Sequence, residues 1–160
     1  MERYGFQPAR GDNIAYAVDI SEDKPVFREV GRMAAVVRAR GRFSIRPADL
    51  DHWKDELDRI HILLNRSLAH LPDHRDWPRE VVYHSLAPFR KIADPELILF
   101  AQEGDRTVGW LPGIPNLNEA FIHVNGLRYP WNYLALWRRL RRRARCLTIK
   151  SILSPPEYWG

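Results

Sequence analysis

Polar side chains that could bind a substrate gather just after Pro115. Asn116, Asn118 and Glu119 lie within four positions of it, and amide and carboxylate groups at such spacing could line a substrate pocket. The same residue types also cap the first turn of a helix, because their oxygens accept hydrogen bonds from unpaired backbone N–H groups. The sequence alone leaves both interpretations open.

Histidine and cysteine residues give no catalytic assignment. His70 and His74 are four apart, which is typical of a zinc-binding helix, but Pro72 breaks any helix between them. We therefore predict a surface loop there. Cys146 is the chain's single cysteine and cannot form an internal disulfide. Because it stands at the start of a predicted strand, we predict a small core residue.

Positive charge is concentrated in one short run. The formal net charge is +5, and removing six arginines that fall within eight positions would leave −1. Such a run could mark nucleic-acid binding. No recognised nucleic-acid motif accompanies it, so we favour a solvated helix end, where cations are stabilised by the helix dipole. The six are Arg138, Arg139, Arg141, Arg142, Arg143 and Arg145.

Length and composition are those of about one globular domain. The chain has 160 residues and is 45% hydrophobic and 28% charged, which excludes disordered and low-complexity classes. No apolar run approaches the ~20 residues of a membrane span, and the first residues lack the apolar core of a signal peptide. We therefore expect a cytoplasmic protein without a membrane partner.

Hydrophobic periodicity predicts alternating strands and helices. Asp49 and Asp51 are candidate caps for the clearest helix, and the strand at 97–101 reads as buried on both faces. Four tryptophans fall on apolar faces and are predicted core residues: Trp53, Trp110, Trp131 and Trp137. The predicted strands are 14–20, 42–46, 97–101, 107–111 and 147–153, and the predicted helices are 25–40, 53–68, 78–86, one beginning at 115–119, and 131–143.

From residue 42 onward this order is strand, two helices, hairpin, two helices, strand, a mixed α/β (α+β) class with a mainly antiparallel sheet. Together with the closing segment 153–160, it resembles the GNAT superfamily of N-acetyltransferases. A closer resemblance is to bacterial proteins that join two GNAT-like units in one chain. Segments 2–6, 44–50, 115–118 and 125–126, and the position of Asn65, carry that resemblance.

The resemblance implies a domain organisation and a cofactor. Residues 1–20 would be the last strand of a preceding unit, 21–41 a connecting helix, and 42–160 the N-terminal part of a GNAT-like domain. In that family a glycine-rich loop holds the pyrophosphate of acetyl-CoA through backbone amides. Here the sequence stops before the loop's further glycines, and Trp159 replaces the usual Gln or Arg. The implied cofactor-binding residues are Leu153, Ser154, Trp159 and Gly160.

Intact relatives would transfer an acetyl group from acetyl-CoA to a small-molecule or peptide amine. We expect this chain to lack the cofactor loop and the activity. The resemblance favours a substrate role for Asn116, Asn118 and Glu119. An alternative is a non-catalytic remnant that self-associates, as a homodimer, through the open edge of strand 147–153. A nucleic-acid binder built on the arginine run is the least favoured hypothesis.

Overall fold

The computed structural model describes residues 16–19, 21–91, 93–124, 127–140, 145–149 and 151–159. The chain divides into two compact units, Met1–Arg40 and Gly41–Gly160. The predicted strand at 14–20 is not seen where it can be checked, because residues 16–19 have no regular secondary structure. A strand needs a hydrogen-bonded neighbour, and none of the described strands pairs with this segment.

Helix α1 spans Pro25–Ala39 in the first unit, as its apolar spacing predicts. Pro25 occupies the first helical position, where a missing N–H costs no helical hydrogen bond. After the helix the chain turns at Gly41, whose φ of 63° lies in the left-handed region that glycine adopts readily. None of the helix residues is buried. Its exposed apolar residues include Val26, Val30, Met33 and Val37.

The described strands of the second unit form one antiparallel sheet in the order β1-β2-β3-β4, so the fold class is α+β, as predicted. Short 3₁₀ turns lie at Ala87–Lys91, at Pro95–Leu97 and at Pro156–Tyr158. In chain order the elements are β1 (Ser44–Pro47), α2 (Trp53–Leu68), α3 (Arg79–Leu86), β2 (Ile98–Glu103), β3 (Arg106–Pro115), α4 (Asn118–Phe121), α5 (Pro130–Leu140) and β4 (Leu147–Ile149).

A tight hairpin joins β2 to β3. Glu103 pairs with Arg106, so the turn between them has two residues, and Gly104 adopts the positive φ of 58° that such turns require. The register places Phe100 opposite Trp110 on one side and opposite Arg46 on the other. The hairpin predicted for the strands at 97–101 and 107–111 is confirmed.

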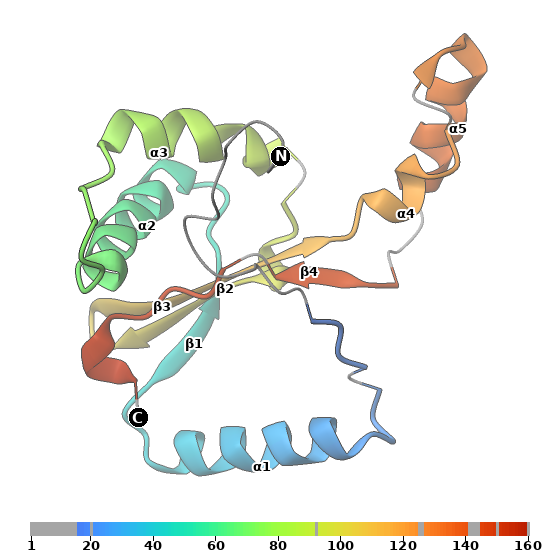
Figure 1. Cartoon of the computed structure of the whole chain (residues 1–160). Coiled ribbons are helices and arrows are strands. Elements are labelled where there is room, and N and C mark those ends of the chain that lie inside the picture. Colours follow the sequence, from blue (N-terminus) through green and yellow to red (C-terminus); the bar gives the residue numbers. More distant parts are fainter. Residues whose placement is uncertain are drawn as a thin grey trace, which may run out of the picture. The chain divides into compact units, whose positions relative to one another are not determined.

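The core lies between α2, α3 and one face of the sheet. Figure 1 shows both helices on the same side of the strands, and Leu57, Ile60 and Phe100 are buried between them. Burial alternates along β2, with Leu99 and Ala101 partly exposed. The prediction of a strand buried on both faces is therefore wrong, because α2 and α3 cover one face only.

Two of the four predicted core tryptophans are on the surface. Trp53 is buried and Trp110 is partly buried against the core, but Trp131 and Trp137 are exposed by half or more. The buried residue of helix α5 is Asn132 instead. The predicted helix is therefore present, but the prediction that its apolar face points into the core is wrong. The end of the predicted helix, 141–143, lies outside the described residues.

Strand β4 lies beyond β3 and is itself exposed along Leu147–Ile149. Cys146, just before it, is also exposed, so the prediction of a core cysteine is wrong. Gly113 pairs with Ile149 and Trp110 bridges to Leu153.

Candidate functional site

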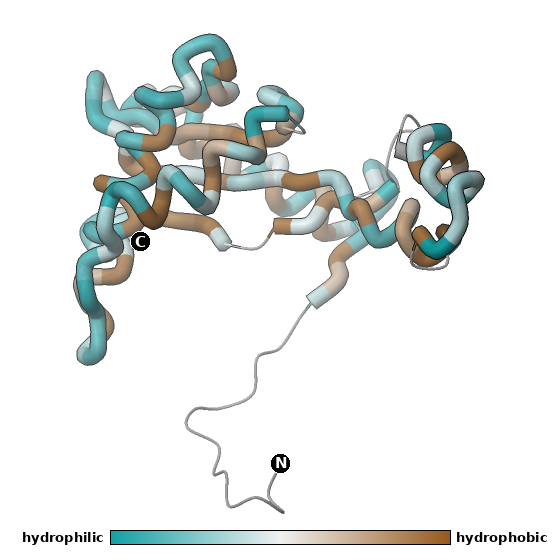
Figure 2. The backbone as a smooth tube through the Cα atoms, turned by 90° about the horizontal axis from the view of Figure 1, so that it is seen from above, coloured by the Kyte–Doolittle hydropathy of each residue, from teal (hydrophilic) through white to brown (hydrophobic). Residues whose placement is uncertain are grey.

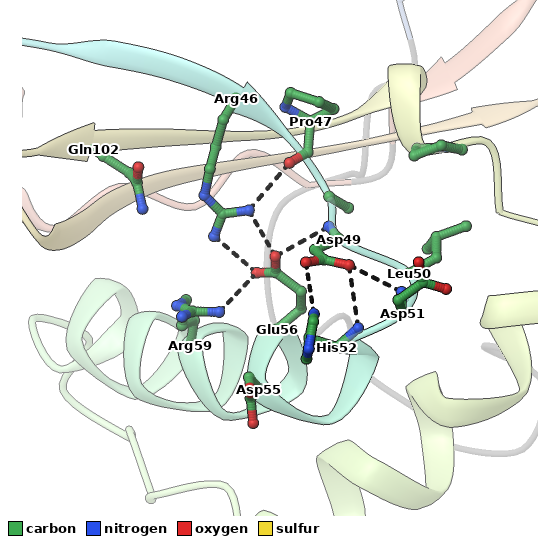
Figure 3. A pocket seen from close by; sticks show the side chains of 12 residues that line it. Arg46, Pro47, Asp49, Leu50, Asp51, His52, Asp55, Glu56, Arg59 and Gln102 are labelled. Atoms are coloured by element: carbon green, nitrogen blue, oxygen red, sulfur yellow. Dashed lines mark hydrogen bonds and ion pairs between the residues drawn. The ribbon is translucent and has the colours of Figure 1, made fainter.

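An open groove of about 750 Å³ lies where β1 runs into α2. Its lining comes from residues 46–52 of β1 and the following loop, from α2, and from Pro95 and Gln102. Figure 3 shows Arg46 and Glu56 facing each other between the sheet and the helix. Sequence analysis did not predict this groove.

Glu56 forms the fully buried end of a hydrogen-bond network in the groove. Its side chain has no exposed area, and Arg46 donates to both carboxylate oxygens, at 2.6 and 3.0 Å. The backbone N–H of Asp49 donates to Oε1 at 3.1 Å, and Arg59 approaches Oε2 at 3.4 Å. A bidentate Arg–carboxylate pair of this kind fixes both side chains strongly.

The charge state of Glu56 follows from these contacts. Burial raises the pKa of its carboxyl group, but the hydrogen bonds from Arg46 and the Asp49 amide outweigh that effect and leave the pKa below its usual value. Glu56 therefore stays ionised near neutral pH, with its oxygens already occupied. Its role in the groove is to hold Arg46 in place, not to accept a proton.

A histidine–aspartate pair stands at the mouth of the same groove. His52 Nδ1 lies 2.8 Å from Asp49 Oδ2, and both side chains are exposed by about half or more. This hydrogen bond raises the pKa of His52 and lowers the pKa of Asp49. A histidine oriented by a carboxylate can exchange a proton near neutral pH.

The predicted capping of α2 by Asp49 or Asp51 is wrong, because no side chain caps the start of this helix. Asp49 instead forms hydrogen bonds within the turn that precedes α2. Its Oδ1 accepts hydrogen bonds from the backbone N–H groups of Asp51 and His52, at 2.9 and 3.1 Å. The residue that directly precedes α2 is His52, which makes no side-chain cap itself. Charges of both signs line the groove, with Arg59 and His52 among the basic residues and Asp51 and Asp55 among the acidic ones, so the lining favours neither a cationic nor an anionic ligand.

The implied cofactor residues lie in the segment after β4. Leu153 is buried, and its N–H and C=O both bond to Trp110 at 3.0 Å. The indole N–H of Trp159 donates to the Ser154 carbonyl at 2.9 Å, and its ring meets His70 edge to face. Gly160 lies outside the described residues. The turn therefore folds back on itself and onto the end of α2.

A side-chain hydrogen bond fastens that turn to Glu103, the last residue of β2. Tyr158 donates its hydroxyl proton to Glu103 at 2.7 Å, and Arg42 donates to the other oxygen of the same carboxylate at 2.5 Å. These two hydrogen bonds lower the pKa of Glu103, while the bond to Glu103 raises the pKa of Tyr158. Arg66 pairs with Glu157 in addition.

Two of the three implied substrate residues, Asn116 and Glu119, accept hydrogen bonds from backbone N–H groups. Asn116 Oδ1 accepts the backbone N–H of Asn118 at 3.2 Å, which forms a turn at the start of α4. Glu119 accepts the N–H groups of Arg145 and Cys146, at 3.0 and 2.8 Å, and these bonds lower its pKa. The carboxylate of Glu119 thus ties α4 to the chain entering β4. A substrate role for these residues remains a prediction.

One sequence signal could have located the groove. Glu56 falls on the same helical face as Trp53, Ile60 and Leu63, and a carboxylate on a buried face requires a cationic partner. Arg46, on the adjacent predicted strand, is such a partner. The His52–Asp49 pair carries no comparable signal, because Asp, Asn and Ser are ordinary residues at helix starts.

No family model, curated protein or solved structure matches this chain. Among the described helices, none has the length and apolar character needed to pass through a bilayer. The described residues also contain no group of three or more His, Cys, Asp or Glu side chains placed to hold a metal ion.

Proposed function

We propose that the second unit is the N-terminal part of an acetyl-CoA-dependent N-acetyltransferase domain of the GNAT type. The supporting observation is the topology: β1, two helices, a β2–β3 hairpin and β4 build one antiparallel sheet in sequential order. This is the order on which the resemblance in the sequence rests. The chemistry is carried over from that resemblance: an amine attacks the thioester carbonyl, a C–N bond forms, and the C–S bond breaks to release a thiolate.

The segment after β4 supports this proposal. In the implied arrangement acetyl-CoA lies along the last strand of such a unit, with its pyrophosphate at the following loop. Leu153, at that point of the chain, forms an isolated bridge with Trp110 of β3. The bonds from Tyr158 and Arg66 hold the subsequent turn against the sheet and α2.

Few amide donors remain in that turn for a phosphate ligand. Pro155 and Pro156 have no N–H, and the amides of Leu153, Tyr158 and Trp159 already donate to carbonyl groups within the protein. Pyrophosphate binding needs several convergent, unpaired N–H groups. We therefore expect the 160-residue chain by itself to bind acetyl-CoA weakly.

A chimeric chain tests this proposal. A glycine-rich loop, helix and strand from an acetyltransferase of known structure would be joined after Gly160. In titration calorimetry we expect the original chain to show no saturation below about 1 mM acetyl-CoA, and the chimera to bind about a hundredfold more tightly. The control replaces the loop glycines by alanine, which keeps the backbone from approaching the phosphates. A folded chimera that fails to bind acetyl-CoA contradicts the proposal.

A second candidate function is self-association through β4. Among the described strands, β4 pairs with β3 only, and Leu147 and Ile149 are about 40–45% exposed along it. Segment 147–149 has no charge or proline to block pairing, whereas β1 at the other edge carries Arg46 and Pro47. An exposed apolar edge of this kind can pair antiparallel with the same strand of a second copy.

Light scattering across a dilution series tests this second function. We expect the wild-type chain to dimerise reversibly, and Ile149→Lys to shift it to monomer because the lysine would place charge on the pairing edge. Ile45→Lys, which places the same charge on β1, is the matched control and should leave the dimer intact. A wild-type monomer at every concentration contradicts β4 pairing.

A further inference from the structure

Helix α5 exposes the face that would normally be buried. Trp131, Tyr133, Leu134 and Trp137 are 50–64% exposed, whereas Asn132 is 9% exposed. The buried Nδ2 of Asn132 has no hydrogen-bond partner among the described residues. A solvated helix shows the reverse arrangement, with apolar residues inward and polar residues outward. The helix therefore carries a surface suited to an apolar environment.

Further exposed apolar residues lie at the end of α4 and just before α5. Ile122 is the most exposed of them, at 73%. The rings of Tyr129 and Trp131 stack with centroids 4.7 Å apart and planes inclined by 8°. In Figure 2 brown hydrophobic segments lie beside teal ones along this part of the tube, at the right of the view. We name the following residues the aromatic patch: Phe121, Ile122, Tyr129, Trp131, Tyr133, Leu134 and Trp137.

The part of the sequence that contains the aromatic patch carries positive charge and no negative charge. No acidic residue occurs between Glu119 and Glu157. Arg128 lies over the Tyr129 ring, 5.6 Å from its centroid, and Arg138 and Arg139 close the helix. The sequence of this interval also contains Arg141, Arg142, Arg143, Arg145 and Lys150.

Three occupants of the patch can be compared by chemistry. A second copy of the chain would bring the same uncompensated positive charge, so like charges would oppose it. A nucleic acid offers phosphates and bases that stack on aromatic rings, but it gives no apolar environment to Ile122 and Leu134. An anionic bilayer surface offers phosphates for the arginines, an interface for Trp and Tyr, and acyl chains for aliphatic groups.

We propose that the aromatic patch docks onto an anionic lipid surface, with α5 lying in the plane of the headgroups. The aromatic and aliphatic side chains would enter the boundary of the acyl chains, and the arginines would contact lipid phosphates. This is adsorption at one leaflet, since 11 residues of helix are too short to cross a bilayer. Adsorption at one leaflet is the single point in which this proposal departs from the sequence-based expectation of no membrane partner. The proposal is independent of the proposed acetyltransferase relationship.

Vesicle co-sedimentation with the full chain tests the docking. We expect binding to phosphatidylcholine vesicles that contain about 30% phosphatidylserine, little binding to pure phosphatidylcholine, and weaker binding at high salt. The double variant Trp131→Ser/Leu134→Ser should reduce binding about tenfold, because it removes two apolar groups from the interface. Trp77→Ser, on an exposed tryptophan between α2 and α3, is the matched control and should bind as the wild type does.

Several outcomes would overturn the proposal. These are absence of binding to anionic vesicles, binding that the Trp131→Ser/Leu134→Ser change leaves unaltered, and displacement of the chain from vesicles by an equal charge concentration of single-stranded DNA. A second measurement needs no variant: bromine atoms on the acyl chains of bound anionic vesicles should quench tryptophan fluorescence. Unquenched fluorescence in the vesicle-bound chain would show that the tryptophans stay outside the bilayer and would contradict the inference.

Discussion

At the scale of single residues, Glu56 determines how the groove is built. It is the buried carboxylate among the groove's lining residues, and its partner Arg46 lies over the ring of Phe100, 4.8 Å from the centroid. The pair joins β1 to α2 beside the core. Removing one partner of a buried ion pair leaves the other charge without compensation, which costs more than the pair contributes when intact.

We predict that Glu56→Gln destabilises the protein by about 2–4 kcal/mol, because the amide cannot accept both guanidinium bonds and Arg46 loses its counter-charge. Urea unfolding measures this change. Glu80→Gln, on the exposed start of α3, is the control and should change stability by less than about 0.5 kcal/mol. Equal effects in the two variants would mean that the pair contributes nothing specific.

At the scale of elements, α3 is held onto α2 by a surface network. Arg79 donates two hydrogen bonds to Asp58, at 2.6 and 2.7 Å, and one to the Tyr83 hydroxyl oxygen at 2.9 Å. Tyr83 in turn donates to the carbonyl of Lys54. The bonds from Arg79 lower the pKa of Asp58 to about 2, so the carboxylate stays ionised well into acid.

This lowered pKa predicts how stability depends on pH. Asp58 stabilises the folded state fully above its usual pKa of 3.8, and that contribution is lost as the pH falls toward about 2. Between pH 4 and pH 2, the free energy of unfolding should therefore fall less steeply in Asp58→Asn than in the wild type. Urea unfolding at each pH measures both slopes. Identical slopes would show that the Asp58–Arg79 pair does not form in solution.

The elements differ in how far sequence could predict them. Helix α2 and the β2–β3 hairpin were predictable, because an apolar stripe and a Gly-Asp turn are local signals. The direction of the α5 face was not, since periodicity gives the spacing of apolar residues and not which neighbour covers them. The groove was missed although Glu56 falls on the buried face of α2, because that position predicts a cationic partner without indicating which element supplies it.

At the scale of the whole molecule, the order of the strands was predictable from the sequence. The assignment of function depends in addition on the residues that would bind a ligand. The hairpin predicts the β2–β3 pairing, and strands that follow one another along the chain usually lie side by side in a sheet. The residues implied as a cofactor site, Leu153, Ser154 and Trp159, prove to be tied into the protein by their own backbone and side-chain bonds. Their contribution to ligand binding therefore depends on the groups that the turn presents to acetyl-CoA.

Mapping acetyl-CoA on the isotope-labelled chain by amide NMR tests the central proposal most directly. We expect weak binding, with a Kd of about 1 mM or above, and shift changes confined to β4 and the turn of residues 154–159. Adenosine, which lacks the pyrophosphate and the pantetheine arm, should leave these amides unchanged. Shift changes that centre on the groove around Arg46 and His52 would contradict a cofactor site beside β4. The absence of any shift change at the highest soluble concentration of acetyl-CoA would contradict it as well.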